Sequence, residues 1–123
     1  VALLSRRDSH HAWAAAQSAG LPPPWHSCES ALSEAFHLLG PSGTAPLSEM
    51  LLREAVSTDF NLQDHRIPVS SLLVKYKDVP MSLADACIVR LTEILPDPLV
   101  LTTDEDFRIY RRSGRHTIPC LLP

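Results

Sequence analysis

The chain has 123 residues, enough for one domain with a single core, and 45% of its residues are hydrophobic. Its formal net charge of −3 excludes a protein whose overall field draws it onto nucleic acid, so such contacts would have to come from local basic patches. No apolar run is long enough to span a membrane, and the widely spaced Cys28, Cys87 and Cys120 show no zinc-site spacing and indicate a reducing compartment.

The first half of the chain predicts helices joined by turns rich in proline and glycine. Ser9 is expected to cap a helix that ends at Gly20, and residues 25–29 are expected to contain a short strand. A helix follows over residues 30–39, with Glu34 at the edge of its apolar arc. Pro46 is expected to begin the next helix, which runs to residue 56, and residues 60–63 are a candidate strand.

The second half predicts helices over residues 69–76 and 83–95, followed by two strands. Ser82 and Asp85 have the spacing of a capping box at the start of the second helix. The apolar face of that helix is expected to consist of Ala84, Cys87, Ile88, Leu91 and Leu95. Residues 98–102 form a continuous apolar run, typical of a strand buried on both faces. A short helix ending at Gly114 and a last strand over residues 117–122 complete the prediction.

Strands that alternate with helices predict an α/β fold with a parallel sheet covered on both sides, within one domain over residues 1–123. The functional crevice of such a sheet lies at the carboxyl ends of its strands. Asp104 lies at that end of the 98–102 strand, Glu34 follows the 25–29 strand, and Asp85 opens the helix that precedes residues 98–102. These three acids are the candidates for one site, although Asp85 can also be interpreted as a helix cap only.

Carboxylates gathered at one edge repel one another unless some are protonated or a cation neutralises them. Ligands that are all oxygen suit Mg²⁺ or Mn²⁺, and such ions support the hydrolysis of phosphodiesters. Other chemistries find little support, because the chain has only four glycines and contains neither a phosphate-cradling glycine loop nor a nucleophile elbow.

A basic patch follows the last acidic segment and is interleaved with the aromatic residues Phe107 and Tyr110. Arginines beside an acidic metal site hold phosphates, although a solvated helix face would show the same pattern. The patch consists of Arg108, Arg111, Arg112, Arg115 and His116.

Four segments, taken together, resemble the PIN domain of the VapC-type toxin ribonucleases. They are ALLSRRDSHHAWA near the start, SEAFHLL around Glu34, KYKDVPMSLADACIV around Asp85, and LTTDEDFRIYR around Asp104. The segments span nearly the whole chain in the order and spacing of the family. The combination of KY-x-D-x-PM-x-LADA with TTD-x-DF is fairly specific.

The resemblance implies a three-layer α/β/α fold and a Mg²⁺- or Mn²⁺-dependent endoribonuclease that cleaves single-stranded RNA. It further implies a cytoplasmic homodimer whose partner is a small antitoxin protein. Glu34, Asp85 and Asp104 match three of the family's acids, and Asp106 would replace or supplement Asp104. Thr102 or Thr103 would help to hold the metal ion or its water.

The chain departs from the family at its start, because the family's first strand and first acid have no counterpart here. We therefore expect weak metal binding, and we keep as an alternative a catalytically inactive PIN-like module that binds RNA or a protein. A third interpretation is a doubly wound domain with an unrelated ligand, whose acids are caps and surface charges.

Overall fold

The computed structural model describes all residues 1–123, which divide into two compact units. The first unit comprises Val1–Asp59 with Pro123, and the second comprises Phe60–Leu122. The fold is mixed α/β, and its strands form three two-stranded sheets. The three-layer arrangement around one sheet and the single domain stay predictions. No helix combines the length and the apolar character that crossing a membrane requires.

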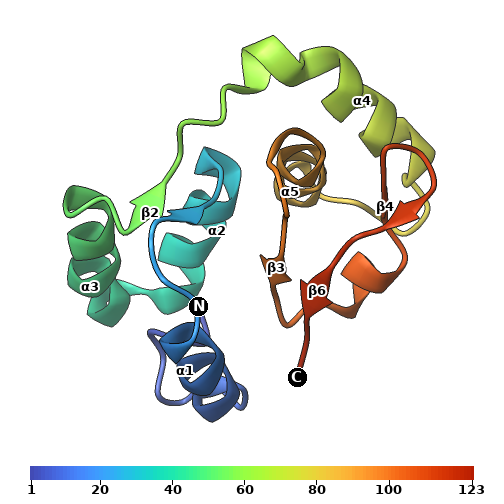
Figure 1. Ribbon diagram of the computed structural model, residues 1–123. Coiled ribbons are helices and arrows are strands. Elements are labelled where there is room, and N and C mark those ends of the chain that lie inside the picture. The colour runs from blue at the N-terminus through green and yellow to red at the C-terminus, as the bar shows by residue number, and fades with distance from the viewer. The chain divides into compact units, whose positions relative to one another are not determined.

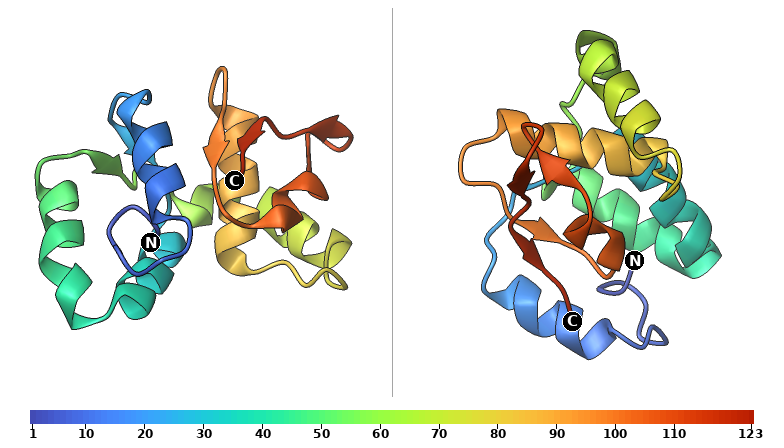
Figure 2. Two further views of the ribbon diagram at one scale, coloured as in Figure 1. Left: turned by 90° about the horizontal axis from the view of Figure 1, so that it is seen from below. Right: turned by 90° about the vertical axis from the view of Figure 1, so that its right-hand side faces the viewer.

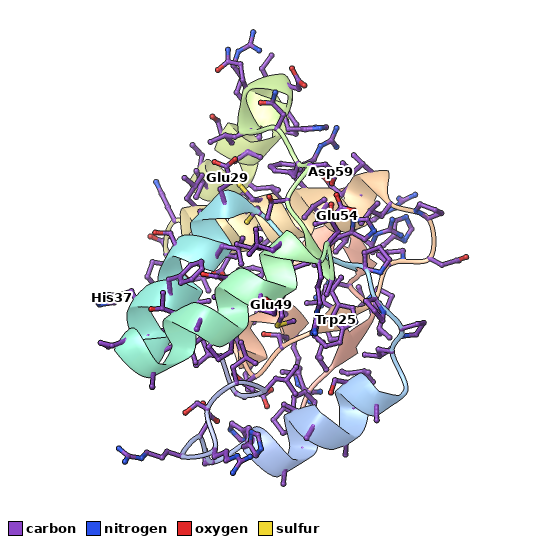
Figure 3. All side chains as sticks on the ribbon, turned by 90° about the vertical axis from the view of Figure 1, so that its left-hand side faces the viewer. Trp25, Glu29, His37, Glu49, Glu54 and Asp59 are labelled. Atoms are coloured by element: carbon purple, nitrogen blue, oxygen red, sulfur yellow. The ribbon has the colours of Figure 1, made fainter.

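In the first unit, three helices accompany one pair of parallel strands (Figure 1). The elements are α1 (His11–Ala19), β1 (Trp25–His26), α2 (Glu29–Leu39), α3 (Pro41–Leu52) and β2 (Val56–Ser57). Trp25 pairs with Val56, and the indole Nε1 of Trp25 donates a hydrogen bond to the carbonyl of Leu21 at 3.1 Å. Figure 3 labels Trp25 together with Glu29 of α2 and Glu49 of α3. The strand predicted within residues 25–29 and the helix predicted over 30–39 are confirmed.

Three boundaries of the first half differ from the predictions. The third helix begins at Pro41 because Gly40, with a φ of 68°, turns the chain directly from α2 into α3, so Pro46 lies inside the helix. No strand occupies residues 60–63, since the pairing strand is β2. No side chain caps α1, so the predicted cap by Ser9 is wrong; just before the helix, Asp8 Oδ1 accepts a hydrogen bond from the His10 amide at 2.8 Å.

In the second unit, two helices pack together beside short strands and two 3₁₀ turns (Figures 1 and 2). The elements are η1 (Leu62–His65), α4 (Arg66–Lys75), α5 (Leu83–Ile94), β3 (Val100–Leu101), η2 (Glu105–Arg108), β4 (Arg111–Arg112), β5 (His116–Thr117) and β6 (Cys120–Leu121). Strands β3 and β6 are parallel, whereas β4 and β5 form an antiparallel hairpin.

Helix α5 is buried on several sides and not only on one apolar face. The buried residues are Ala84, Ala86, Cys87, Val89, Leu91 and Thr92. Ala86 and Val89 have no exposed surface, whereas Ile88 and Leu95, which were predicted to face the core, are only half-buried. A helix that is covered on several sides loses the simple periodicity from which its inner face is predicted.

Two predictions around the last acidic segment need correction. The strand predicted over residues 98–102 is present as β3, but it is only two residues long, and these residues are half-buried because β3 pairs with β6 alone. The basic segment is not a helix ending at Gly114 but the turn η2 followed by the β4–β5 hairpin. Ser113 and Gly114 take positive φ values of 50° and 86°, as tight hairpin turns require.

Candidate functional site

Asp85 is held in the first turn of α5 by the predicted capping box. The Ser82 hydroxyl oxygen accepts a hydrogen bond from the Asp85 amide at 3.0 Å, and Asp85 Oδ2 accepts one from the Ser82 amide at 3.3 Å. Asp85 Oδ2 also accepts a hydrogen bond from the Tyr110 hydroxyl at 2.9 Å. No hydrogen bond reaches Asp85 Oδ1, so one oxygen of this carboxylate remains available to a ligand.

Asp104 and Asp106 lie beyond the carboxyl end of β3, but only the Asp104 side chain accepts a hydrogen bond. The Asp104 amide donates to the hydroxyl oxygen of Thr102 at 3.0 Å, and Asp104 Oδ1 accepts from the Asp106 amide at 2.9 Å. Asp104 therefore caps η2, as an aspartate at an N-cap commonly does. The Asp106 carboxylate accepts no hydrogen bond, so both of its oxygens are available.

Asp85, Asp104 and Asp106 interact electrostatically. Loss of hydration raises the pKa of Asp106, and the negative charges of Asp104 and Asp85 raise it further. Burial raises the pKa of Tyr110, as do its hydrogen bond to Asp85 and the charges of the three acids. Tyr110 consequently keeps its proton at neutral pH and acts as a hydrogen-bond donor to Asp85.

The raised pKa of Asp106 predicts a pH-dependent gain in stability for Asp106→Asn. Because the folded-state pKa lies above the ordinary value of 3.8, ionisation of Asp106 opposes folding at pH values above that raised pKa. Asp106→Asn should therefore raise the melting temperature at about pH 7. The gain should vanish at about pH 3, where Asp106 of the wild type is protonated in both the folded and the unfolded state. Thermal melts followed by circular dichroism at both pH values measure this difference. Glu105→Gln, which removes a neighbouring exposed carboxylate paired with Arg108, should give no such gain.

Glu34 belongs to the first unit, where it lies exposed on α2. Its participation in a site with the aspartates of the second unit stays a prediction.

The arginines of the basic patch differ in the hydrogen bonds and ion pairs that their side chains make. Arg112 donates from Nε and Nη2 to the carbonyl of Thr92 in the last turn of α5, at 3.0 and 2.5 Å. Arg111 donates to backbone carbonyls of its own segment, and the exposed Arg108 pairs with Glu105 at 2.6 Å. Arg115 is exposed in the β4–β5 turn and makes no hydrogen bond or ion pair. Arg115 and Arg108 are therefore the guanidinium groups most accessible to an anion.

Tyr110 is the functional candidate that the sequence interpretation missed. The sequence places it among the arginines as an interleaved aromatic residue, and the structure buries it completely. The sequence carried no signal for this role, because the burial that makes the hydroxyl need an acceptor is visible only in the structure.

The carboxylates of the second unit suit a hard divalent cation in an open site. Carboxylate oxygen is the donor that Mg²⁺ and Mn²⁺ prefer. In neither unit do three carboxylate, imidazole or thiol groups converge closely enough to form a complete metal cage. Mg²⁺ is commonly held by one or two carboxylates, with water and substrate phosphate completing the shell. Asp85, Asp104 and Asp106 each have at least one oxygen that accepts no hydrogen bond, and such oxygens fit that kind of site.

Comparisons with protein-family models, with curated proteins and with solved structures found no match to this chain.

Proposed function

We propose that this protein is a PIN-like, metal-dependent endoribonuclease of the toxin–antitoxin type, which hydrolyses phosphodiester bonds of single-stranded RNA. The observation that carries the proposal is the group formed by Asp85, Asp106 and Tyr110, in which one acid is fixed by two donors and its neighbour is unbonded. The proposal includes the three-layer fold, a cytoplasmic location, a homodimer and a small antitoxin partner, all of which rest on the sequence resemblance.

In this proposal, Asp85, Asp104 and Asp106 hold Mg²⁺ or Mn²⁺ through the oxygens that accept no hydrogen bond. Asp104 holds the turn that carries Asp106, through its bond to the Asp106 amide. A bound divalent cation supplies an activated water and stabilises the charge that develops on the leaving oxygen.

The arginines supply the contacts to the RNA backbone. Arg115 and Arg108, which are exposed, contact phosphates directly. Arg112 fixes the β4–β5 hairpin against the end of α5 through its two bonds to the Thr92 carbonyl. Arg111, whose guanidinium bonds to three carbonyls of its own segment, keeps that segment in the shape that presents Arg108.

The test is an RNA cleavage assay on the purified chain. A labelled single-stranded RNA should be cut in the presence of Mn²⁺ or Mg²⁺, and cutting should stop when EDTA removes the metal. An RNA duplex of the same sequence serves as the control substrate and should be cut much more slowly. Cleavage that persists in EDTA would exclude a metal-dependent reaction by this chain. RNA binding without any cleavage would contradict the enzyme and favour the catalytically inactive binding module.

A further inference from the structure

The Tyr110 hydroxyl reaches Asp85 from a distant part of the chain. Its hydrogen bond to Asp85 Oδ2, 2.9 Å long, joins residues 25 positions apart and links the end of η2 to the first turn of α5. The same oxygen already accepts the Ser82 amide in the capping box. Both donors therefore converge on Oδ2, and Oδ1 accepts no hydrogen bond. A cap alone would not require the second donor, because the capping box is complete without it.

The ring of Tyr110 has little freedom to move its hydroxyl elsewhere. It has no exposed surface and meets two aromatic rings edge-on, Tyr76 at 5.2 Å and Phe107 at 5.3 Å between ring centroids. Tyr76 is itself fixed, because its hydroxyl oxygen accepts a hydrogen bond from the Arg111 amide at 2.9 Å. The direction of the Tyr110 hydroxyl is thus set by packing, and its bond holds Asp85 Oδ2 together with the longer bond from the Ser82 amide.

We infer that Tyr110 is a positioning residue for Asp85, because its hydroxyl holds Oδ2 and so keeps Oδ1 presented as the oxygen that receives a divalent cation. This inference rests on the proposed function, since it assigns a role within the proposed metal site. Carboxylates that bind metals are in turn hydrogen-bonded, and loss of such a partner typically weakens metal binding about 10- to 100-fold.

The first test compares Mn²⁺ affinity, measured by isothermal titration calorimetry, in the wild-type chain and two hydroxyl deletions. Tyr110→Phe removes only the bond to Asp85 and should weaken Mn²⁺ binding about 10- to 100-fold. Tyr76→Phe is the matched control, because it removes the neighbouring hydroxyl of the same aromatic cluster, which touches no acid. Tyr76→Phe should bind Mn²⁺ as the wild type does. Equal affinities in all three proteins would overturn the inference.

A second measurement needs no metal and tests the orientation of the Asp85 side chain separately from cation binding. The NMR couplings between the α and β protons of Asp85 report whether its side chain occupies one staggered conformer. We expect a single conformer in the wild type and in Tyr76→Phe. In Tyr110→Phe the couplings should shift toward averaged values, because only the 3.3 Å bond from the Ser82 amide then holds the carboxylate. Unchanged couplings in Tyr110→Phe would overturn the orienting role. A wild-type chain that binds no Mn²⁺ would overturn the proposed function and the cation-binding part of the inference, while the couplings still decide the orienting part.

Discussion

Asp85→Asn is expected to abolish metal-dependent cleavage of single-stranded RNA while leaving the fold in place. The substitution keeps the shape of the side chain, and the amide oxygen of asparagine can still accept the hydrogen bonds that Ser82 and Tyr110 donate to Asp85. It removes the negative charge, and a neutral amide is a much weaker ligand for Mg²⁺ or Mn²⁺ than a carboxylate. Cleavage of a labelled RNA in Mn²⁺, with circular dichroism spectra of both proteins, measures the effect.

The matched control is Asp97→Asn, which makes the same chemical change beyond the other end of α5. Asp97 is exposed and takes a positive φ of 48°, a conformation that asparagine adopts readily. This variant should cleave RNA as the wild type does. If Asp85→Asn instead lost helical signal and cleaved at the wild-type rate, Asp85 would be a helix cap and no more.

Phe107→Ala is expected to cause a large loss of stability. Phe107 is only 5% exposed, and its ring lies edge-on to Tyr110 at 5.3 Å. Removing a buried phenyl ring leaves a cavity and costs about 3–5 kcal/mol of unfolding free energy. That cost is a large share of the 5–15 kcal/mol that typically stabilises a folded protein, so the midpoint of urea unfolding should fall sharply.

Ile109→Ala is the control for Phe107→Ala, because Ile109 lies two residues away and is 52% exposed. Its loss should change the unfolding free energy by no more than about 0.5 kcal/mol, as is usual for surface substitutions. Urea unfolding followed by far-ultraviolet circular dichroism, which reports on helices α4 and α5 of the second unit, measures both variants. Equal effects of the two substitutions would show that the Phe107 ring is not packed as the structure has it.

The sequence predicted the elements whose signals are local. The capping box of Ser82 and Asp85 marked the start of α5, because both hydrogen bonds of that motif lie within four residues. The two prolines of the third helix show where local signals mislead. Pro41 and Pro46 both suit a helix start, and the choice between them depended on Gly40, whose positive φ places Pro41 at the first position.

The parts of the candidate site that escaped prediction depend on contacts between distant residues. The bond between Tyr110 and Asp85 joins the segment between η2 and β4 to the first turn of α5. The spacing of residues in neither segment predicts it. The Ser113–Gly114 pair did carry a local turn signal, but the arginines around it were interpreted as one face of a helix. The grouping of Glu34, Asp85, Asp104 and Asp106 into one site stays a prediction, whereas the role of Asp104 as the cap of η2 became visible only from its bond to the Asp106 amide.

The narrow pairing of β3 with β6 means that the two ends of the candidate site differ in local stability. Val100 donates to the carbonyl of Pro119 at 2.9 Å and Thr102 to that of Leu121 at 3.2 Å, and these bonds hold the segment that leads to Asp106. Asp85, by contrast, begins a twelve-residue helix with a buried centre. Local opening should therefore release the segment before Asp106 at a lower free-energy cost than α5, so that amide hydrogens of β3 exchange with solvent sooner. In the proposed cation site, Asp85 would then be ordered at all times, whereas the segment that carries Asp106 would open and close. Ligand binding would draw part of its selectivity from the closing of that segment onto α5.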